Sequence, residues 1–422
     1  MMEEKQQNDW KRIAALLCLG WIMIWIYRTM LTPIHEEIEN SVGVRSSLDM
    51  GMISSYYFLS YVLTQIPAGY LMDRAGRKTI LVPGFLLFAA GIFLTGLAPD
   101  IRMIYGGSIL AGIGTGAYYS GAYSISAACV PPAYRYFSTA VINSGCAVGM
   151  ILGYLSGGAV VKTAGVSWRV MVFIAAALTL LTALFLAAGI RKDAPEKTGE
   201  KEKKSLPWNR FLTGRMAGVC FLYFCTCYGY YMIVTWLPSF LEAERGIQGV
   251  AASLYSCLVA AASIPGALIL SRVLDISGKK RVLVMEGLQA GSALMIFFLS
   301  HFTALVPMLL CLAVYGLCGK QAIDPLIVPY VSGEIPEKNR SFGLGIFNFF
   351  GMSGSVLAPG LTGYAEDMTG SKVYGFFIAV VLLLVSSAVF YIADRKGASD
   401  DQIGKQRTPE ASGIKKNRWD KK

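Results

Sequence analysis

The sequence predicts an all-α polytopic membrane protein with twelve transmembrane helices in two six-helix halves. Hydrophobic residues make up 54% of the 422 residues and charged residues only 15%, with a mean hydropathy of +0.50. Soluble domains carry about 25% charged residues. Apolar segments long enough to cross a bilayer recur along the chain, and a short charged turn recurs about half a chain length later. Together these observations exclude a soluble globular protein.

The apolar segments define the order of the predicted spans. Each is long enough to cross the hydrocarbon core as a helix. The twelve spans are expected at residues 13–34, 50–72, 79–98, 103–129, 138–161, 168–190, 215–240, 251–274, 281–300, 304–332, 342–364 and 373–393. The chain accordingly divides into an N-terminal six-helix half at 1–190, a cytoplasmic linker at 191–214, a C-terminal six-helix half at 215–394 and a disordered cytoplasmic tail at 395–422.

The basic residues are distributed unevenly about these spans. The net charge is +11, but most Lys and Arg residues fall in the termini and in the loops on one side. By the positive-inside rule that side is cytoplasmic, with both termini inside the cell and the protein in the plasma membrane. The basic residues on the outer side are Arg45, Arg102, Lys162, Arg169, Arg245 and Lys372. The positive charge therefore indicates membrane orientation and not nucleic-acid binding.

Cysteine and histidine usage argues against a disulfide framework, a metal site or an enzyme. All nine cysteines fall within spans, and the two histidines, His35 and His301, lie near outer span ends. The pattern from Gly112 to Ala117 resembles a dinucleotide fingerprint but lies inside an apolar span, not after a strand. No nucleophile–base constellation is evident, so we expect no enzyme activity and no cofactor.

The segment from Gly69 to Lys78 is a charged turn between the second and third spans. Asp73, Arg74 and the basic pair at 77–78 are costly in hydrocarbon, so the chain leaves the membrane there. Gly69 allows close helix approach, and Gly76 supplies the positive φ that a tight reversal needs. The pattern recurs 202 residues later. The matching residues of the two turns are Asp73, Gly76 and Arg77 in the first, and Asp275, Gly278 and Lys279 in the second.

This pair of turns closely resembles the signature loops of the major facilitator superfamily, which join the second to the third span and the eighth to the ninth. The resemblance covers roughly residues 12 to 395. It implies a secondary transporter whose two halves rock about a central site, with the first, fourth, seventh and tenth spans lining the cavity. The turns would then stabilise one closed state. The gating residues it implies are Gly69, Asp73, Arg74, Gly76, Arg77, Asp275, Gly278 and Lys279.

The fifth predicted span carries glycines at a four-residue spacing, which places them in one stripe along the helix. Such a stripe permits close helix packing and sliding, and a static packing seam is the equally weighted alternative. In the drug/proton antiporters of the superfamily this span carries a Gly-Pro pair, whereas here Met150 follows Gly149. This departure disfavours drug efflux. The stripe consists of Gly145, Gly149, Gly153 and Gly157.

Two interior positions of the predicted spans stand out for their charge. Arg28 is in the first span, and Lys320 and Asp324 are in the tenth. Charges within the membrane usually face a water-filled cavity and mark a substrate or ion path. The Arg28 guanidinium suits a carboxylate and Lys320 adds a point charge from the other half, so an organic anion is the expected substrate. Asp324 is the candidate proton-coupling residue. The alternatives are a structural role for Arg28 and mutual neutralisation of Lys320 and Asp324 at i, i+4.

Aromatic and amide side chains surround these charges in the predicted spans. Trp25 shares the helix face of Arg28. In the seventh span, Tyr228 and Tyr231 are expected to share a cavity-facing side, and Asn348 lies in the eleventh. Flat apolar walls with a few hydroxyl groups suit a medium-sized organic acid.

Three short motifs resemble the anion:cation symporter branch of the superfamily. They are Tyr27–Arg28, Thr235–Pro238 and Phe347–Gly351. The branch moves organic acids with protons or sodium. Its members often carry an acid before the first-span arginine and another in the fourth span, whereas this chain has Tyr27 and Thr115 there. Uniport or exchange therefore stays open beside proton symport.

We therefore expect a monomeric transporter that moves a small organic anion by alternating access, with a proton or sodium as the possible coupling ion. Two alternatives remain open. An exporter of amphipathic compounds would keep its transport after Arg28→Ala, and a membrane sensor would bind ligand without flux.

Overall fold

The computed structural model describes residues 2–130, 135–190, 213–277, 281–334 and 340–407. Its regular elements are all helices, with no strand among the described residues. Most of the predicted linker, the end of the tail at 408–422, and the predicted gating residues Gly278 and Lys279 lie outside the described residues. The same is true of the side chains of Asp73, Arg74 and Asp275.

The N-terminal half accounts for the first six predicted spans. Two of these spans are divided, the fourth at Ala117 between α5 and α6, and the fifth where α7 passes into the π-helical η3. The elements are α1 (Met2–Met30), η1 (Thr32–Ile34), α2 (His35–Val42), α3 (Ser47–Ala75), α4 (Arg77–Leu97), α5 (Ile101–Gly116), α6 (Tyr118–Cys129), α7 (Arg135–Leu155), η3 (Ser156–Thr163) and α8 (Trp168–Gly189).

The C-terminal half accounts for the other six predicted spans. Its tenth span is divided at Gly319, which has an extended backbone between α13 and α14. The elements are α10 (Gly214–Arg245), α11 (Val250–Ser277), α12 (Arg281–His301), α13 (Leu305–Cys318), α14 (Lys320–Glu334), α15 (Arg340–Thr369) and α16 (Val373–Arg407). The predicted all-α architecture of twelve spans is thus confirmed. Within the described residues, eight helical segments are by themselves long and apolar enough to cross a membrane.

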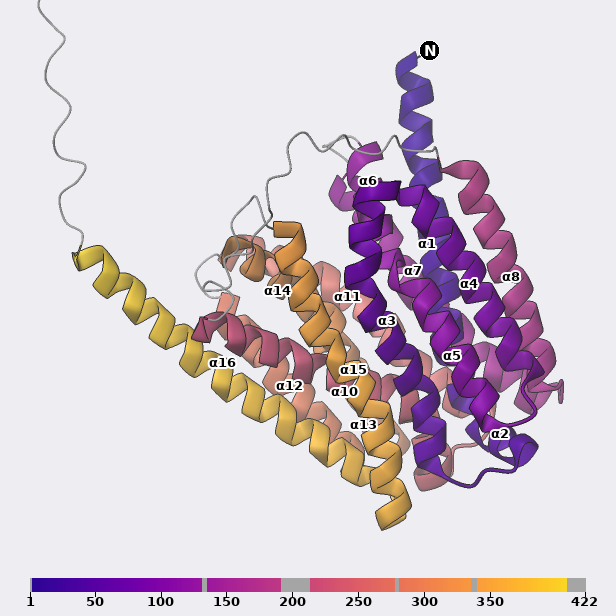
Figure 1. Ribbon diagram of the computed structural model, residues 1–422. Coiled ribbons are helices and arrows are strands. Elements are labelled where there is room, and N and C mark those ends of the chain that lie inside the picture. Colours follow the sequence, from indigo (N-terminus) through magenta and orange to yellow (C-terminus); the bar gives the residue numbers. More distant parts are fainter. Residues whose placement is uncertain (1, 131–134, 191–212, 278–280, 335–339, 408–422) are drawn as a thin grey trace, which may run out of the picture.

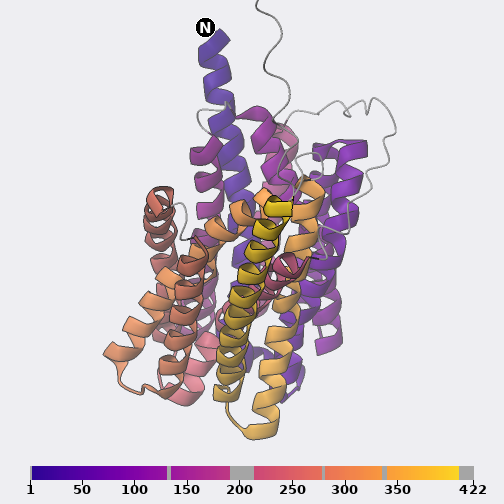
Figure 2. The ribbon, with the colours of Figure 1, turned by 90° about the vertical axis from the view of Figure 1, so that its left-hand side faces the viewer.

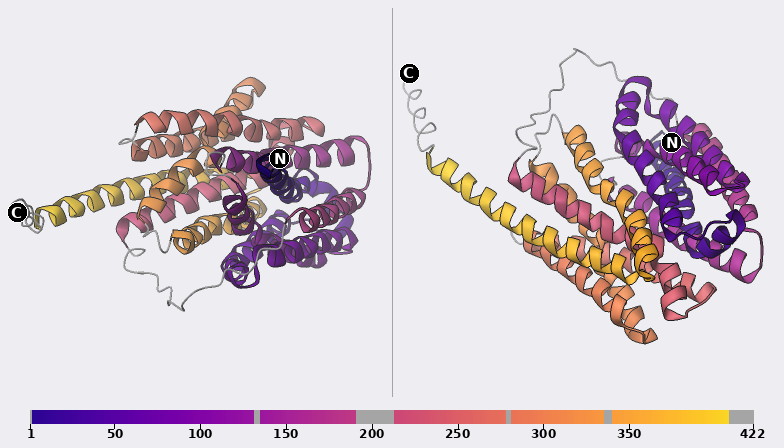
Figure 3. Two further views of the ribbon diagram at one scale, coloured as in Figure 1. Left: turned by 90° about the horizontal axis from the view of Figure 1, so that it is seen from above. Right: turned by 60° about the horizontal axis from the view of Figure 1, so that its bottom comes forward.

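Two local predictions need correction. Helix α16 continues to Arg407 and extends away from the other helices (Figures 1 and 3), so residues 395–407 are helical where a disordered tail was predicted. This segment contains no proline and many Lys, Arg, Gln and Asp residues, so the helix can continue in water beyond the apolar span. At Gly69, an added Cβ would meet open space, so no helix makes the predicted close approach. Gly76 does adopt a positive φ of 90° between α3 and α4.

The helices up to α8 form one group and those from α10 onward form the other (Figure 1). Figure 2 shows α15 and α16 of the second group running side by side. The groups meet chiefly where α3 packs on α15 and α7 packs on α11. Helices α3 and α15 are antiparallel, because Gly363 approaches Ser47 at one end and Asn348 bonds Gln65 farther along. The ribbons converge at the end that carries α2, called the α2 end below.

The predicted glycine stripe lies on α7 against α1. A Cβ at Gly145 would meet Cys18 and Trp21, and one at Gly149 would meet Ile22 and Trp25. Gly153 and Gly157 approach α1 in the same way, near Thr29 and Met30. The stripe therefore sets how closely α7 packs on the helix that carries Arg28.

Candidate functional site

Arg28, in the last turn of α1, lies in a cage of aromatic rings. Its side chain is buried, with 8% of the residue exposed. The guanidinium carbon lies 5.2 Å from the Trp25 ring centroid, 5.2 Å from Tyr57, 5.3 Å from Phe58 and 4.8 Å from Tyr61. All four distances are within the range of cation–π attraction. The cage holds the cation without neutralising its charge.

One tyrosine of α3 orients the guanidinium. Arg28 Nε donates to the Tyr57 hydroxyl at 3.1 Å, and this hydroxyl lies 2.8 Å from Thr115 Oγ1 at the end of α5. Tyr57 and Tyr61 are one turn apart on α3 and their rings stack at 6.3 Å with an interplanar angle of 9°. Helices α1, α3 and α5 thus fix the direction in which the remaining N–H groups of Arg28 point.

Two donors at the aromatic cage lack acceptors. Arg28 Nη2 and Trp25 Nε1 are buried, and among the described residues neither has a hydrogen-bond partner. No carboxylate in the described part of the chain forms an ion pair with Arg28. A buried charge without a counter-ion is costly, and so is a buried donor without an acceptor. An anion beside Arg28 would relieve both costs.

The second predicted charge cluster lies on α14. Lys320 Nζ bonds to Asp324 Oδ2 at 2.6 Å, which fulfils the i, i+4 pairing that the sequence allows. The Lys320 ammonium also lies 5.4 Å from the centroid of the Tyr223 ring on α10. Asp324 Oδ1 is buried without a hydrogen-bond partner among the described residues. The pair is therefore only partly satisfied.

Tyr231 of α10 connects the two clusters. Its ring stacks on Trp25 at 6.2 Å with an interplanar angle of 14°, and it meets Phe58 edge-on at 4.5 Å. Both Arg28 and Lys320 lie within electrostatic reach of Tyr231. The predicted residues Trp25, Arg28, Tyr231 and Lys320 therefore converge at the junction of the two halves.

Two other predicted site residues lie elsewhere. Tyr228 packs in an apolar cluster of the C-terminal half with Met232 and Leu383, so it does not share the cavity-facing side of Tyr231. The two tyrosines are three positions apart, which rotates one about 60° from the other, enough here to turn Tyr228 toward α16. Asn348 donates to Gln65 Oε1 at 3.1 Å and joins α15 to α3 one turn beyond Tyr61. It borders the aromatic cage without contacting Arg28.

Sequence reasoning missed the α3 side of the cage. Tyr57, Phe58 and Tyr61 lie in the second span, which the family resemblance does not count among the cavity-lining helices. Only their clustering in an apolar span could have drawn attention to them, because cation–π contacts between spans leave no local pattern. A small cavity beside the cage is lined by Arg28, Thr32 and His35, so it extends from the cage toward the α2 end.

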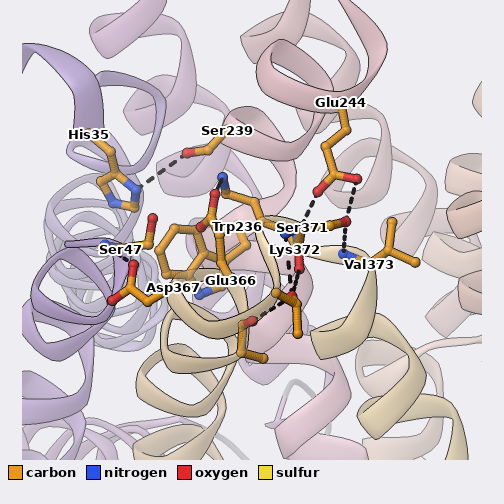
Figure 4. A network of polar contacts seen from close by, with 12 residues as sticks. His35, Ser47, Trp236, Ser239, Glu244, Glu366, Asp367, Ser371, Lys372 and Val373 are labelled. Atoms are coloured by element: carbon orange, nitrogen blue, oxygen red, sulfur yellow. Dashed lines mark hydrogen bonds and ion pairs between the residues drawn. The ribbon is translucent and has the colours of Figure 1, made fainter. Parts of the chain in front are cut away.

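The halves are joined across the α2 end by polar contacts (Figure 4). His35 Nδ1 lies 3.3 Å from Ser239 Oγ, and the His35 ring meets the edge of Trp236 at 5.2 Å. Within the C-terminal half, Lys372 lies 5.4 Å from the centroid of the same Trp236 ring and pairs with Glu366, so the surface that faces His35 is held in place. This end of the molecule is therefore closed.

Further contacts across the halves reinforce this closure. Lys162 of η3 pairs with Glu242 of α10. The Tyr154 hydroxyl donates to the carbonyl of Val234 at 2.7 Å. Asp367 of α15 accepts hydrogen bonds from the first turn of α3. These contacts lie between the α2 end and the site around Arg28.

Comparisons with known proteins agree with this architecture. The chain is 26% identical over 404 residues to a probable sulfoacetate transporter, SauU, of Cupriavidus necator, covering 89% of this chain and 91% of the relative. It is 24% identical to a probable galactarate/D-glucarate transporter, GudP, of Bacillus subtilis, covering 85% and 86%. A solved bacterial homologue of the human lysosomal transporter Spinster, inward-facing and unoccupied, superposes with a TM-score of 0.76 at 15% identity, covering 93% and 98%.

A family model decides the classification. The model of the Major Facilitator Superfamily matches residues 13–359 and again 219–419, which together span most of the chain. The prediction made from the paired charged turns is confirmed. This integral membrane protein is a transporter that belongs to the Major Facilitator Superfamily.

Proposed function

We propose that this protein is a secondary transporter that moves a small organic carboxylate across the plasma membrane by alternating access, with Arg28 binding the carboxylate. The observation that carries the proposal is the buried Arg28 guanidinium, which has an unpartnered Nη2 and no counter-ion among the described residues. A carboxylate would accept from Nη2 as a charge-assisted hydrogen bond. The adjacent unpartnered Trp25 Nε1 supplies a second donor.

The named relatives support an anionic substrate. One is named for sulfoacetate and another for galactarate and D-glucarate, all of which are organic acids. Each aligns over most of this chain. The aromatic cage agrees with this substrate class because it leaves the charge of Arg28 uncompensated.

Alternating access is proposed from the uneven closure of the two ends. The α2 end is closed by the contacts of His35, Lys162 and Asp367, whereas the Asp324 side chain at the site retains 26% exposure. Substrate would therefore exchange through the opposite end in this state. The positive-inside rule makes that end cytoplasmic. The charged turns at Asp73 and Asp275 would close it in the other state.

A ligand screen by thermal shift tests the binding proposal, because a ligand that binds only the folded state raises the apparent stability. Purified full-length protein is heated with small carboxylates, neutral sugars and cationic drugs. We expect stabilisation by carboxylates alone. Arg28→Ala should weaken carboxylate binding about 10- to 100-fold, the equivalent of a lost charge-assisted hydrogen bond of about 1.5–3 kcal/mol.

Arg102→Ala is the matched control, because Arg102 is an exposed arginine at the start of α5. It should leave carboxylate binding unchanged. Stabilisation by cationic or neutral compounds that persists in Arg28→Ala would instead favour the export alternative. Carboxylate binding without any flux in liposomes would favour the sensor.

A further inference from the structure

We propose that the substrate is a dianion, an organic acid with two acidic groups, and that its second acidic group replaces Asp324 on Lys320. This inference rests on the proposed function. It adds a second binding position on α14. Asp324 pairs with Lys320 there until the second acidic group of the substrate takes its place.

The first acidic group belongs at Arg28. Among the described residues, Arg28 Nε donates to Tyr57, and Nη2 is buried without an acceptor. One carboxylate or sulfonate placed beside Nη2 would satisfy this donor with a charge-assisted hydrogen bond. A monoanion would need no more than this position.

The second position follows from the arrangement of the Lys320–Asp324 pair. Both residues belong to α14, so their ion pair holds no two helices together. The Lys320 side chain is 9% exposed and packs by Tyr223, whereas the Asp324 side chain is 26% exposed and its Oδ1 has no partner in the described part of the chain. The cation is therefore fixed and the carboxylate can turn away from it. A substrate carboxylate of the same chemistry can take the place that Asp324 leaves.

The two cations share electrostatic neighbours, Tyr231 and Cys146, and so belong to one region of the site. Tyr231 lies within electrostatic reach of both Arg28 and Lys320, and its stacking on Trp25 forms a flat apolar wall beside them. Gln321, next to Lys320, donates to the Tyr230 hydroxyl at 3.3 Å and so ties α14 to the same wall. One molecule with acidic groups at both ends of an aliphatic or planar chain would engage both cations.

Charge balance links this substrate to a proton. Arg28 and Lys320 contribute two positive charges and ionised Asp324 one negative charge, so the site as it stands balances a monoanion. A dianion is balanced when Asp324 binds one proton from the aqueous phase and becomes a neutral carboxylic acid. The titratable groups that face Asp324 from the surrounding helices are Lys320 on α14, Tyr119 on α6, and Tyr223, Cys227 and Tyr230 on α10.

The test compares each dicarboxylate with its own monoamide, which keeps the length of the molecule and removes one charge. Succinate, glutarate and adipate are titrated into the purified full chain beside their monoamides. We expect at least one dicarboxylate to bind about tenfold or more tightly than its monoamide. Lys320→Met should abolish this difference, because it removes the charge that distinguishes the second carboxylate from an amide.

Asp324→Asn gives an independent readout, because it mimics the protonated acid. At pH values where the dicarboxylates stay fully ionised, their affinity for the unaltered protein should rise as the pH falls, and their affinity for Asp324→Asn should be high and independent of pH. Glu286→Gln on α12 is the matched control, since Glu286 is another carboxylate within a span but bonds Ser387 outside the site. It should keep the pH dependence of the unaltered protein.

The outcomes separate this inference from the proposed function. Equal binding of every dicarboxylate and its monoamide, with both lost in Arg28→Ala, would overturn the dianion inference and leave the carboxylate transporter standing. Binding that is indifferent to Arg28 would overturn the proposed function as well. If Lys320→Met fails to fold, the monoamide comparison and the pH profile of Asp324→Asn still decide the matter.

Discussion

Asp367 of α15 caps the first turn of α3 in the opposite half, its Oδ1 accepting from the backbone N–H of Ser47 at 2.9 Å. Its Oδ2 accepts from the Leu48 N–H at 3.0 Å and from the Ser46 hydroxyl at 2.7 Å. A carboxylate at a helix N-terminus satisfies free N–H groups and is attracted by the helix dipole. The cap comes from the other half, so it exists only while the α2 end is closed.

Asp367→Asn should shift the protein toward a state that is open at the α2 end. Loss of the charge destabilises the state that is closed at the α2 end by about 1 kcal/mol, which changes the equilibrium between the closed and open states roughly fivefold. The measurement is the labelling rate of Ser239→Cys by a membrane-impermeant maleimide, because Ser239 lies beside His35 within the closed end. Asp100→Asn is the control, since Asp100 caps α5 of its own half through Met103. Equal labelling rates in the two variants would contradict the cap as a closure contact.

The ion pair between Lys162 and Glu242 should behave as a second closure contact. Reversing either charge, as Lys162→Glu or Glu242→Lys, places like charges together and should speed labelling of Ser239→Cys. The double exchange restores opposite charges and should return the rate most of the way to that of the unaltered pair. Glu37, 3.9 Å from Lys162, limits the recovery. Labelling in the double exchange as fast as in the single variants would show that the pair does not act across the halves.

Tyr57→Phe should weaken carboxylate binding about fivefold, the equivalent of about 1 kcal/mol for the lost hydrogen bond to Arg28 Nε. The guanidinium would stay in its cage, because the ring of Tyr57 remains, but its direction would no longer be fixed. Tyr27→Phe is the control, since the Tyr27 hydroxyl bonds Thr95 and Ser108 instead. If titration shows a larger loss of carboxylate affinity in Tyr27→Phe than in Tyr57→Phe, the role of Tyr57 in orienting Arg28 is contradicted.

Gly149→Ala should destabilise the protein and displace Trp25. The added Cβ would lie 2.8 Å from Trp25 Cβ and closer still to the Ile22 carbonyl, so α7 and α1 would have to separate. Overpacking of this kind costs about 1–3 kcal/mol. A Cβ at Gly106 of α5 would meet open space, so Gly106→Ala should lower neither the melting temperature nor carboxylate affinity. A melting temperature unchanged by Gly149→Ala would show that the stripe is not tightly packed.

The sequence predicts the helical architecture well because long apolar segments and charged turns are local signals. The spans, the positive φ of Gly76 and the i, i+4 pairing of Lys320 with Asp324 could each be predicted from a single stretch of chain. The breaks at Ala117 and Gly319 could not, because both lie inside continuous apolar segments.

Only part of the site could be predicted, because the sequence reveals local signals but not contacts between helices. Arg28 and Trp25 share a helix face, which the sequence reveals, but Tyr57 and Tyr61 reach Arg28 from another helix through contacts that depend on packing. The cap formed by Asp367 on Ser47 joins residues 320 positions apart, and neither residue is unusual in its own segment. Such contacts become visible only in the folded chain.

The central claim is that Arg28 binds a carboxylate that the protein moves across the membrane, and counterflow in proteoliposomes tests it most directly. Liposomes containing the purified protein and an excess of the carboxylate selected by thermal shift are given a labelled trace of the same compound outside. The account predicts rapid counterflow, a fall of about tenfold or more in Arg28→Lys, whose point charge cannot reproduce the planar fork, and full activity in Arg102→Lys. Counterflow that Arg28→Lys leaves unchanged would contradict it.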